Sequence, residues 1–151
     1  NGTASGTASE LVEIGAMRQK IENIKSDIIL DQTIDYYEQN KSVAVFVNYR
    51  STYDIITEYL KNHDVQYAEI NGQQDSDERQ DNIDLFQNNE VRVIICMIQA
   101  GGSSISLHDL SGRFPRVSII SPSYSRIELI RAKRRVGWSV IGLRTVLYTM
   151  F

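Results

Sequence analysis

Five short stretches rich in β-branched, aromatic and apolar residues constrain the fold of this chain more than any other feature. They cover 43–47, 67–70, 91–96, 117–121 and 145–150, and longer stretches with a helical pattern separate most of them. The run VAVFV at 43–47 has no polar residue, which is typical of a strand buried on both faces. Strands that alternate with helices favour a parallel sheet with helices on both faces. The sequence therefore predicts an α/β three-layer sandwich whose parallel sheet has at least five strands.

Helical periodicity fills the intervals between these strands. The longest predicted helix runs from Glu10 to Asn40, and the apolar residues that recur in it at spacings of three and four are Ile14, Met17, Ile21, Ile24 and Ile28. Three further helices are expected over 52–63, 76–89 and 125–136. Ser51, Ser76 and Ser125 stand where N-cap residues would begin these helices.

The N-terminal segment 1–9 repeats GTAS and has low complexity, so it is expected to be a linker or a remnant of cloning, and the domain is expected to cover 10–151. It lacks the basic and apolar regions of a signal peptide. No apolar stretch approaches the roughly 18 residues of a membrane span, and a single cysteine, Cys96, cannot build a disulfide framework. These features predict an intracellular protein, whether cytoplasmic, nuclear or viral, without a membrane partner.

Basic residues are segregated toward the C-terminal end, although the net charge is −3. Between positions 113 and 144 the only acidic residue is Glu128. The eight basic residues of this segment are Arg113, Arg116, Arg126, Arg131, Lys133, Arg134, Arg135 and Arg144. Such a segment indicates a partner that carries phosphates. A solvated basic helix face is the alternative that charge alone leaves open.

The predicted sheet would gather four polar or small loops at one edge, because ligands of such sheets meet the loops at the carboxyl ends of the strands. These loops are NYRS, NGQQDS, QAGGSS and SPSYS, at 48–51, 71–76, 99–104 and 121–125. Each loop taken singly is also compatible with an ordinary turn. Together they predict a binding edge.

Several common catalytic motifs are missing from the chain. It has no GxxxxGK[ST] phosphate loop, no HExxH, no GxSxG and no dinucleotide fingerprint. His63 and His108 stand too far apart for a spaced ligand pair. The acidic residues Asp75, Asp77 and Glu78 are better explained as a helix N-terminus. No metal site is predicted.

The order of four segments carries a family resemblance. VAVFVNYRSTYDIITEYL (43–60), INGQQDSDERQDNIDLFQNNEVRVIIC (70–96), AGGSSISL (100–107) and SPSYSRIELIRAKRRVGW (121–138) follow one another between about Met17 and Phe151. This order resembles the second, C-terminal RecA-like lobe of superfamily 2 helicases and translocases, nearest to the Swi/Snf-like and viral branches. The segments are similar to motif IV, the segment after it, motif V and the region of motif VI. The resemblance implies the RecA-like fold of the P-loop NTPase helicases.

The resemblance also implies two sets of site residues. The nucleotide-binding set is Gly102, Ser104, Ser106, Arg131 and Arg135. The nucleic-acid-binding set is Asn48, Arg50, Asn71, Gly72, Ser103, Lys133 and Arg134. Small residues such as Gly101 and Gly102 let backbone N–H groups approach a phosphate oxygen. The implied partners are nucleic acid, DNA or RNA, and a first RecA-like lobe outside this chain. ATP and Mg²⁺ are implied cofactors only together with that lobe, and this domain alone is not expected to hydrolyse ATP.

Motif VI departs from the family pattern around its candidate catalytic residue. Arg135 matches the first family arginine, the finger that stabilises charge on the transferred phosphoryl group. Arg131 replaces the usual Gln, Arg134 the usual Gly, and Trp138 the second Arg. Tryptophan cannot supply the charged fork of arginine, so weak or absent turnover is expected. The alternatives are a non-catalytic, nucleic-acid-binding relic of the helicase fold, or an α/β module that binds a phosphorylated ligand.

Overall fold

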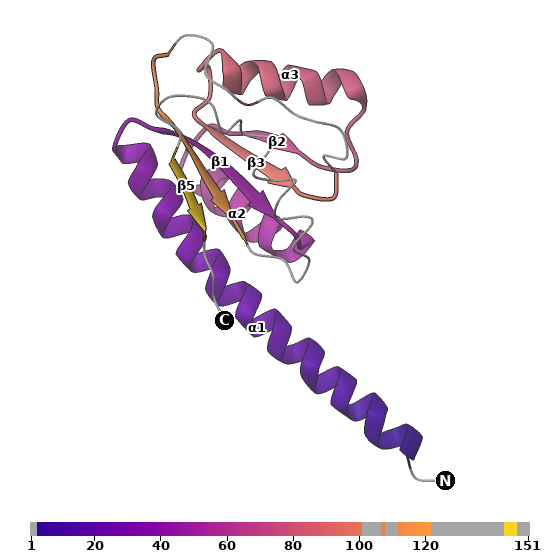
Figure 1. Cartoon of the computed structure of the whole chain (residues 1–151). Coiled ribbons are helices and arrows are strands. Elements are labelled where there is room, and N and C mark those ends of the chain that lie inside the picture. The colour runs from indigo at the N-terminus through magenta and orange to yellow at the C-terminus, as the bar shows by residue number, and fades with distance from the viewer. Residues whose placement is uncertain (1–2, 101–106, 108–111, 122–143, 148–151) are drawn as a thin grey trace.

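The computed structural model describes residues 3–100, 107, 112–121 and 144–147. Its elements are α1 (Thr3–Glu38), β1 (Ser42–Val47), α2 (Arg50–Asn62), β2 (Ala68–Ile70), α3 (Ser76–Gln87), β3 (Val93–Met97), β4 (Arg116–Ile120) and β5 (Arg144–Leu147) (Figure 1). Each of the five predicted strands is present. The helix predicted over 125–136 lies outside the described residues.

All five strands form one parallel sheet, in the order β2-β3-β1-β4-β5. The central strand β1 pairs with β3 on one side and with β4 on the other, and Val45 lies level with Ile95 and Ile119. These strands have the continuous apolar sequences expected of a sheet buried on both faces. The predicted parallel sheet is confirmed.

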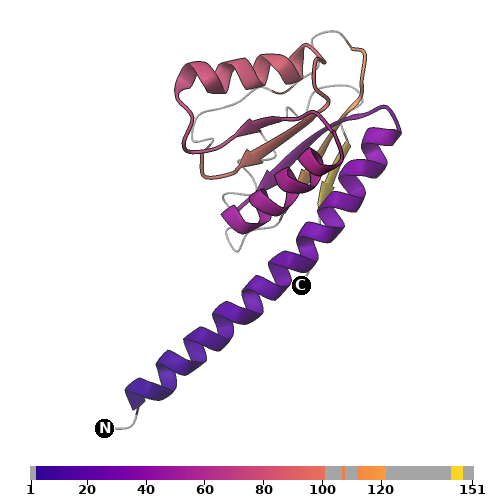
Figure 2. The same ribbon diagram turned by 180° about the vertical axis from the view of Figure 1, so that it is seen from behind.

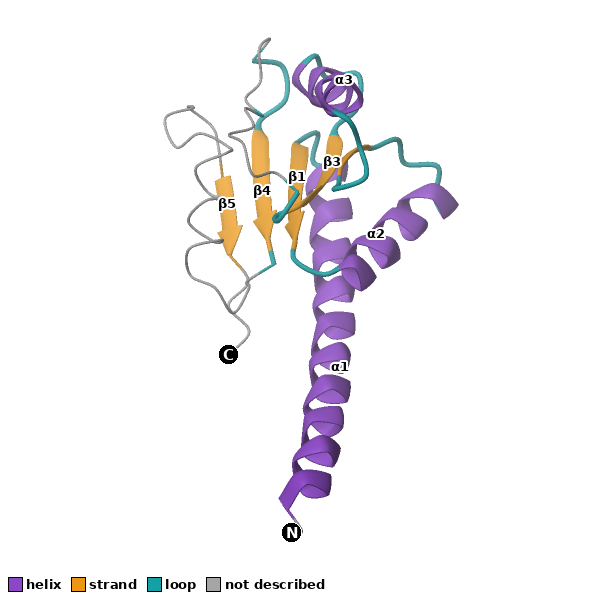
Figure 3. Cartoon of the chain, turned by 90° about the vertical axis from the view of Figure 1, so that its right-hand side faces the viewer, coloured by secondary structure: helices purple, strands orange, loops and turns teal. Residues whose placement is uncertain are grey.

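Alternate residues of β1 enter two separate cores. Val43, Val45 and Val47 pack with Ile56 and Leu60 of α2 and with residues of α1. The intervening residues Ala44 and Phe46 pack on the other face, in the core that contains Ile83 and Phe86 of α3. This alternation follows from the period of two in a strand. Figures 2 and 3 show α3 on one side of the sheet and α1 with α2 on the other, which is the predicted three-layer arrangement.

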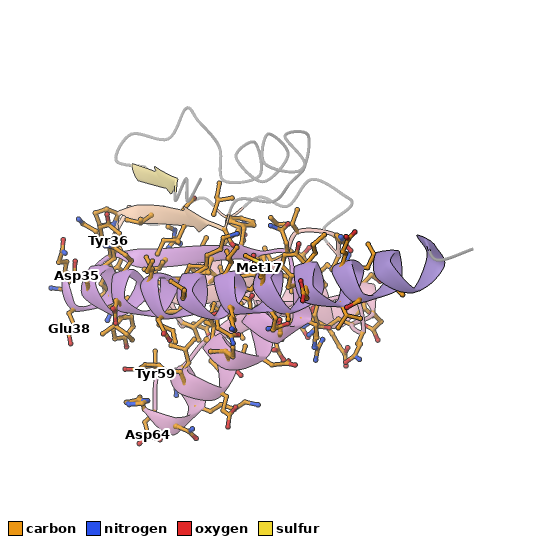
Figure 4. The ribbon with its side chains drawn as sticks, turned by 90° about the horizontal axis from the view of Figure 1, so that it is seen from below. Met17, Asp35, Tyr36, Glu38, Tyr59 and Asp64 are labelled. Carbon is orange, nitrogen blue, oxygen red and sulfur yellow. The ribbon has the colours of Figure 1, made fainter. Side chains whose placement is uncertain are left out.

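The first helix is longer than its apolar periodicity predicts. It begins at Thr3 rather than at Glu10, so residues 3–9 continue α1. Adding residues to an existing helix costs far less than nucleating one, which lets weak helix formers such as Thr and Ser extend it. The start of the domain at residue 10 stays a prediction. The N-terminal half of α1 projects beyond the sheet (Figures 1 and 2) and exposes Leu11, Val12 and Met17, the last labelled in Figure 4.

Two of the predicted helix caps are wrong. The N-cap of α3 is Asp75 rather than Ser76, and its Oδ1 accepts from the backbone N–H groups of Asp77 (3.0 Å) and Glu78 (2.8 Å). A carboxylate is favoured there because it also faces the positive end of the helix dipole. Helix α2 begins at Arg50, so Ser51 lies inside it, and its N-cap Tyr49 makes no side-chain capping bond.

Candidate functional site

The carboxyl ends of β1, β2, β3 and β4 meet at one edge of the sheet, as predicted. This edge brings together the segments 48–51, 71–76 and 98–100 and the residue Ser121. Four of the predicted nucleic-acid-binding residues therefore lie at the same edge: Asn48, Asn71 and Gly72 in loops, and Arg50 at the first position of α2. The other eight predicted site residues lie outside the described residues: Gly102, Ser103, Ser104, Ser106, Arg131, Lys133, Arg134 and Arg135.

A bond from Asn48 joins the ends of β1 and β4. Its Nδ2 donates to the backbone oxygen of Ser121 at 3.0 Å. The chain leaves β1 toward β2 and β3 on one side and leaves β4 toward β5 on the other, so this is the topological switch point, where open α/β sheets bind ligands. Asn48 Oδ1 and Ser121 Oγ are buried and have no hydrogen-bond partner among the described residues. The edge thus holds unsatisfied polar atoms at its centre, which is uncommon in a protein interior.

Arg50 is exposed and weakly held at the start of α2. Its Nε lies 3.1 Å from Asp54 Oδ1 in an ion pair whose side chains are 52% and 58% exposed. Its guanidinium stacks over the ring of Tyr53, 4.9 Å from the ring centroid. An exposed pair of this kind contributes less than about 1 kcal/mol. Arg50 can therefore exchange Asp54 for a phosphate at little cost.

A buried ion pair supports the first turn of α2 from α1. Lys25 Nζ donates to Glu22 Oε1 at 2.8 Å, and Thr52 Oγ1 donates to Glu22 Oε2 at 3.2 Å. Glu22 and Lys25 are only 3% and 5% exposed. The carboxylate places a negative charge near the N-terminus of α2, whose cap lacks a side-chain bond. Sequence reasoning missed this pair because charged residues of an amphipathic helix are expected on its solvent side.

The hydroxyl of Tyr53 joins α2 to the end of β2. It donates to Glu69 Oε2 and accepts from Asn71 Nδ2 at 3.0 Å. Burial, and then the hydrogen bond to Glu69, raise the pKa of Tyr53 well above its usual range. The phenol therefore stays protonated at physiological pH and remains a donor.

Asn71 and Gly72 present different groups at this edge. The Asn71 side chain is buried, and both its polar ends are bonded within the chain: Nδ2 to Tyr53, and Oδ1 to the N–H of Gln73 at 3.0 Å. Gly72 is exposed, its φ is not positive, and an added Cβ would have open space around it. Neither backbone conformation nor packing within the described residues requires glycine there. At this turn the backbone of Gly72 is exposed to solvent.

The three basic residues of the segment 113–144 that the structure describes do not lie at the predicted binding edge. Arg116 is 2% exposed at the start of β4, where its guanidinium donates to Asn89 Oδ1 (2.8 Å) and to the backbone oxygen of Phe86 (2.9 Å). Arg144 begins β5 beside Val117, so its backbone also lies at the amino edge of the sheet. Arg113 precedes β4 at that same edge. Arg116 therefore supports the fold at the end of α3. The backbones of Arg113 and Arg144 lie at the edge opposite the predicted binding loops.

The part of the chain that the structure describes contains neither a membrane-spanning helix nor a metal-binding cluster. None of the helices there is both long and apolar enough to cross a membrane. No group of three or more His, Cys, Asp or Glu side chains within the same ranges could hold a metal ion.

Comparison with known proteins gives consistent matches. The model of the helicase conserved C-terminal domain family matches residues 24–139. The chain is 42% identical over 127 residues to the putative ATP-dependent RNA helicase L364 of Acanthamoeba polyphaga mimivirus, covering 84% of this chain and 23% of that protein. It is 28% identical over 106 residues to the SWI/SNF-related matrix-associated actin-dependent regulator of chromatin subfamily A-like protein 1 of Drosophila melanogaster, covering 70% and 14%.

The fold is also similar to a solved structure, the C-terminal part of the Fun30 ATPase domain. The TM-score is 0.63 at 22% identity, and the match covers 80% of this chain and 39% of that chain. The chain spans less than a quarter of the length of either curated relative. The order of motifs, the parallel sheet and the family match agree: the chain belongs to the helicase conserved C-terminal domain family and has the RecA-like C-terminal lobe of a superfamily 2 helicase.

Proposed function

We propose that this domain is the C-terminal lobe of a nucleic-acid-dependent ATPase, a helicase or translocase. It holds the phosphate backbone of one strand at the carboxyl edge of its sheet. It also lends Arg135 to a nucleotide site that a first RecA-like lobe completes, where Gly102, Ser104, Ser106 and Arg131 contribute. ATP and Mg²⁺ are bound in the two-lobed protein, which acts inside the cell or in a virus.

The observation that carries the nucleic-acid part is that Arg50 and Gly72, both exposed, follow strands that end at the same edge of the sheet. A guanidinium and a closely approachable backbone are the groups that position a phosphate backbone. The name of the mimivirus relative supports ATP dependence and RNA as the nucleic acid, while that of the Drosophila relative refers to chromatin. The affinities for RNA and for DNA are therefore to be compared.

A non-catalytic relic of the helicase fold is the second candidate. The replacement of the usual arginine by Trp138 and of the usual glycine by Arg134 favours it. Such a protein would keep the nucleic-acid contacts and lose turnover. Binding assays alone do not separate the two candidates. ATPase activity of the full-length protein does, because turnover that depends on nucleic acid, however weak, favours the first candidate and its absence favours the relic.

Binding of nucleic acid by the 151-residue chain is expected to depend strongly on salt. Replacing Arg131, Lys133 and Arg134 together with Ala should reduce the slope of log K against log salt. The reduction should be up to about 0.7 for each phosphate of a single strand that the protein no longer neutralises, and about 0.9 on duplex DNA. Fluorescence anisotropy with RNA and DNA oligonucleotides of the same sequence measures both slopes.

The control for this salt titration replaces Lys20, Lys61 and Arg113, which are exposed elsewhere and change the charge equally. Its slope should stay close to that of the wild type. Equal slopes in the two triple variants would contradict contact by the motif VI basic residues.

Gly72→Ala is expected to weaken binding by about tenfold, because the added methyl group hinders the approach of a phosphate to the backbone N–H. A loss of about tenfold is typical of one charge-assisted hydrogen bond. The methyl group meets open space in the folded chain, so the melting temperature should not fall. Gly15→Ala is the matched control, because its Cβ also meets open space but lies on the projecting half of α1. Affinity of Gly72→Ala equal to that of the wild type would remove this turn from the interface.

A further inference from the structure

The phenol of Tyr53 bridges two loops that the proposed function uses together. Its ring lies beneath the guanidinium of Arg50, and its hydroxyl bonds both Glu69 and Asn71 at the end of β2. Tyr53 is 2% exposed. A phenylalanine would fill nearly the same space, so packing alone does not require the buried hydroxyl. Its two hydrogen bonds are what offset the cost of burying it.

Side chains, rather than strand pairing, organise the turn that the hydroxyl reaches. Strand β2 ends at Ile70, and the turn follows. Gln74 closes it, because Nε2 donates to the backbone oxygen of Glu69 at 2.9 Å and Oε1 accepts from the N–H of Asn71 at 3.1 Å. Asn71 Oδ1 accepts from the N–H of Gln73 at 3.0 Å. The bond from Tyr53 therefore anchors a self-contained loop, with exposed Gly72 at its tip, to α2.

We propose that Tyr53 is a positioning residue that holds the Asn71–Gln74 turn in a fixed place relative to Arg50. The inference rests on the proposed function and names the device by which the two loops grip one backbone together. Phosphates along a strand have a set spacing, so contacts from two loops cooperate only if their separation is fixed before binding. A turn released from α2 has to be ordered when the ligand binds, and that ordering weakens the complex.

Tyr53→Phe tests the proposal because it removes only the hydroxyl. The dissociation constant for a single-stranded oligonucleotide is expected to rise about tenfold, the loss typical of one well-placed contact. The salt slope should stay unchanged, because no cation is removed. Adding Gly72→Ala to Tyr53→Phe should cause little further loss, since both changes act through the same turn. Fluorescence anisotropy between about 50 and 200 mM salt, as in salt titrations of such complexes, gives all of these quantities.

Two further variants separate positioning from stability. Tyr59→Phe makes the same change on the same helix, near the end of α2 where Figure 4 labels Tyr59 beside Asp64. The Tyr59 ring stacks on the His63 ring at the C-terminal end of α2, so the affinity of the Tyr59→Phe variant should equal that of the wild type. Gln74→Ala loosens the turn from its half-exposed side without touching the core. It should weaken binding as Tyr53→Phe does, and it keeps the test valid if Tyr53→Phe does not fold.

The outcomes distinguish this proposal from the function on which it rests. The positioning role is overturned if Tyr53→Phe and Gln74→Ala both bind with wild-type affinity. The proposed function still stands in that case, provided that binding depends on salt and that Gly72→Ala weakens it. Additive losses from Tyr53→Phe and Gly72→Ala overturn the positioning role as well. Wild-type binding that does not respond to salt overturns the proposed function, and the positioning role with it.

Discussion

Replacing Arg116 with methionine is expected to lower the free energy of unfolding of the chain by about 3 kcal/mol. The guanidinium donates to Asn89 Oδ1 and to the backbone oxygens of Phe86 and Gln87, and it stacks on the Phe86 ring at 4.3 Å. It thereby caps the C-terminal end of α3, where a positive charge also interacts favourably with the negative end of the helix dipole. Methionine has a similar length but no donor, so the three hydrogen bonds from the guanidinium are lost. Relief from burying a charge offsets part of this loss.

Urea denaturation and thermal melting check this expectation. A change of this size should lower the melting temperature by about 10 °C in a domain of this length. Arg113→Met is the matched control, because Arg113 is exposed and lies close by, just before the same strand. It should change stability by less than about 0.5 kcal/mol. Equal stability of the two variants would show that the guanidinium does not hold the end of α3.

The double variant Trp138→Arg with Arg134→Gly is expected to raise ATP hydrolysis by the full-length protein by up to about a thousandfold, the scale of an arginine finger in phosphoryl transfer. The prediction follows from the family pattern at motif VI, which lies outside the described residues. The wild type keeps Arg135 but has an indole where the second guanidinium is expected. Its turnover should therefore be weak or absent even with an intact first lobe.

The measurement is steady-state ATPase activity with nucleic acid present. Adding Arg135→Ala to the double variant should abolish the gain, which ties the effect to the nucleotide site. Trp138→Lys with Arg134→Gly is the second control, because it restores charge without the planar fork and should recover less activity. Robust wild-type turnover that the double variant loses would show that the alignment of motif VI is wrong.

Much of the fold could be predicted from the sequence because its signals are local. The apolar run at 43–47 places both of its faces in cores regardless of which helices cover them. Alternation of strands and helices was sufficient to predict parallel pairing, since parallel strands need a crossover between them. The motif order identified the family, which the match over 24–139 confirms.

The roles of individual polar residues were decided by tertiary neighbours instead. Asn71 looked like a contact residue, yet Tyr53, eighteen positions earlier, occupies its amide. Charged residues of a helix are expected to face solvent, but the packing of α2 against α1 buries Glu22 and Lys25. No periodicity in the sequence reveals which element will cover a given side chain.

The basic C-terminal segment shows the same division most clearly. The sequence by itself determined that the positive charge is clustered along the chain, and that strands lie near Arg116 and Arg144. Only the tertiary structure decided that Arg116 is buried at the end of α3, and that the backbones of Arg113 and Arg144 lie at the amino edge of the sheet. Whether such a charge is buried depends on neighbours remote in sequence, such as Phe86 and Asn89 for Arg116, because the helix that covers the end of a strand comes from another part of the chain.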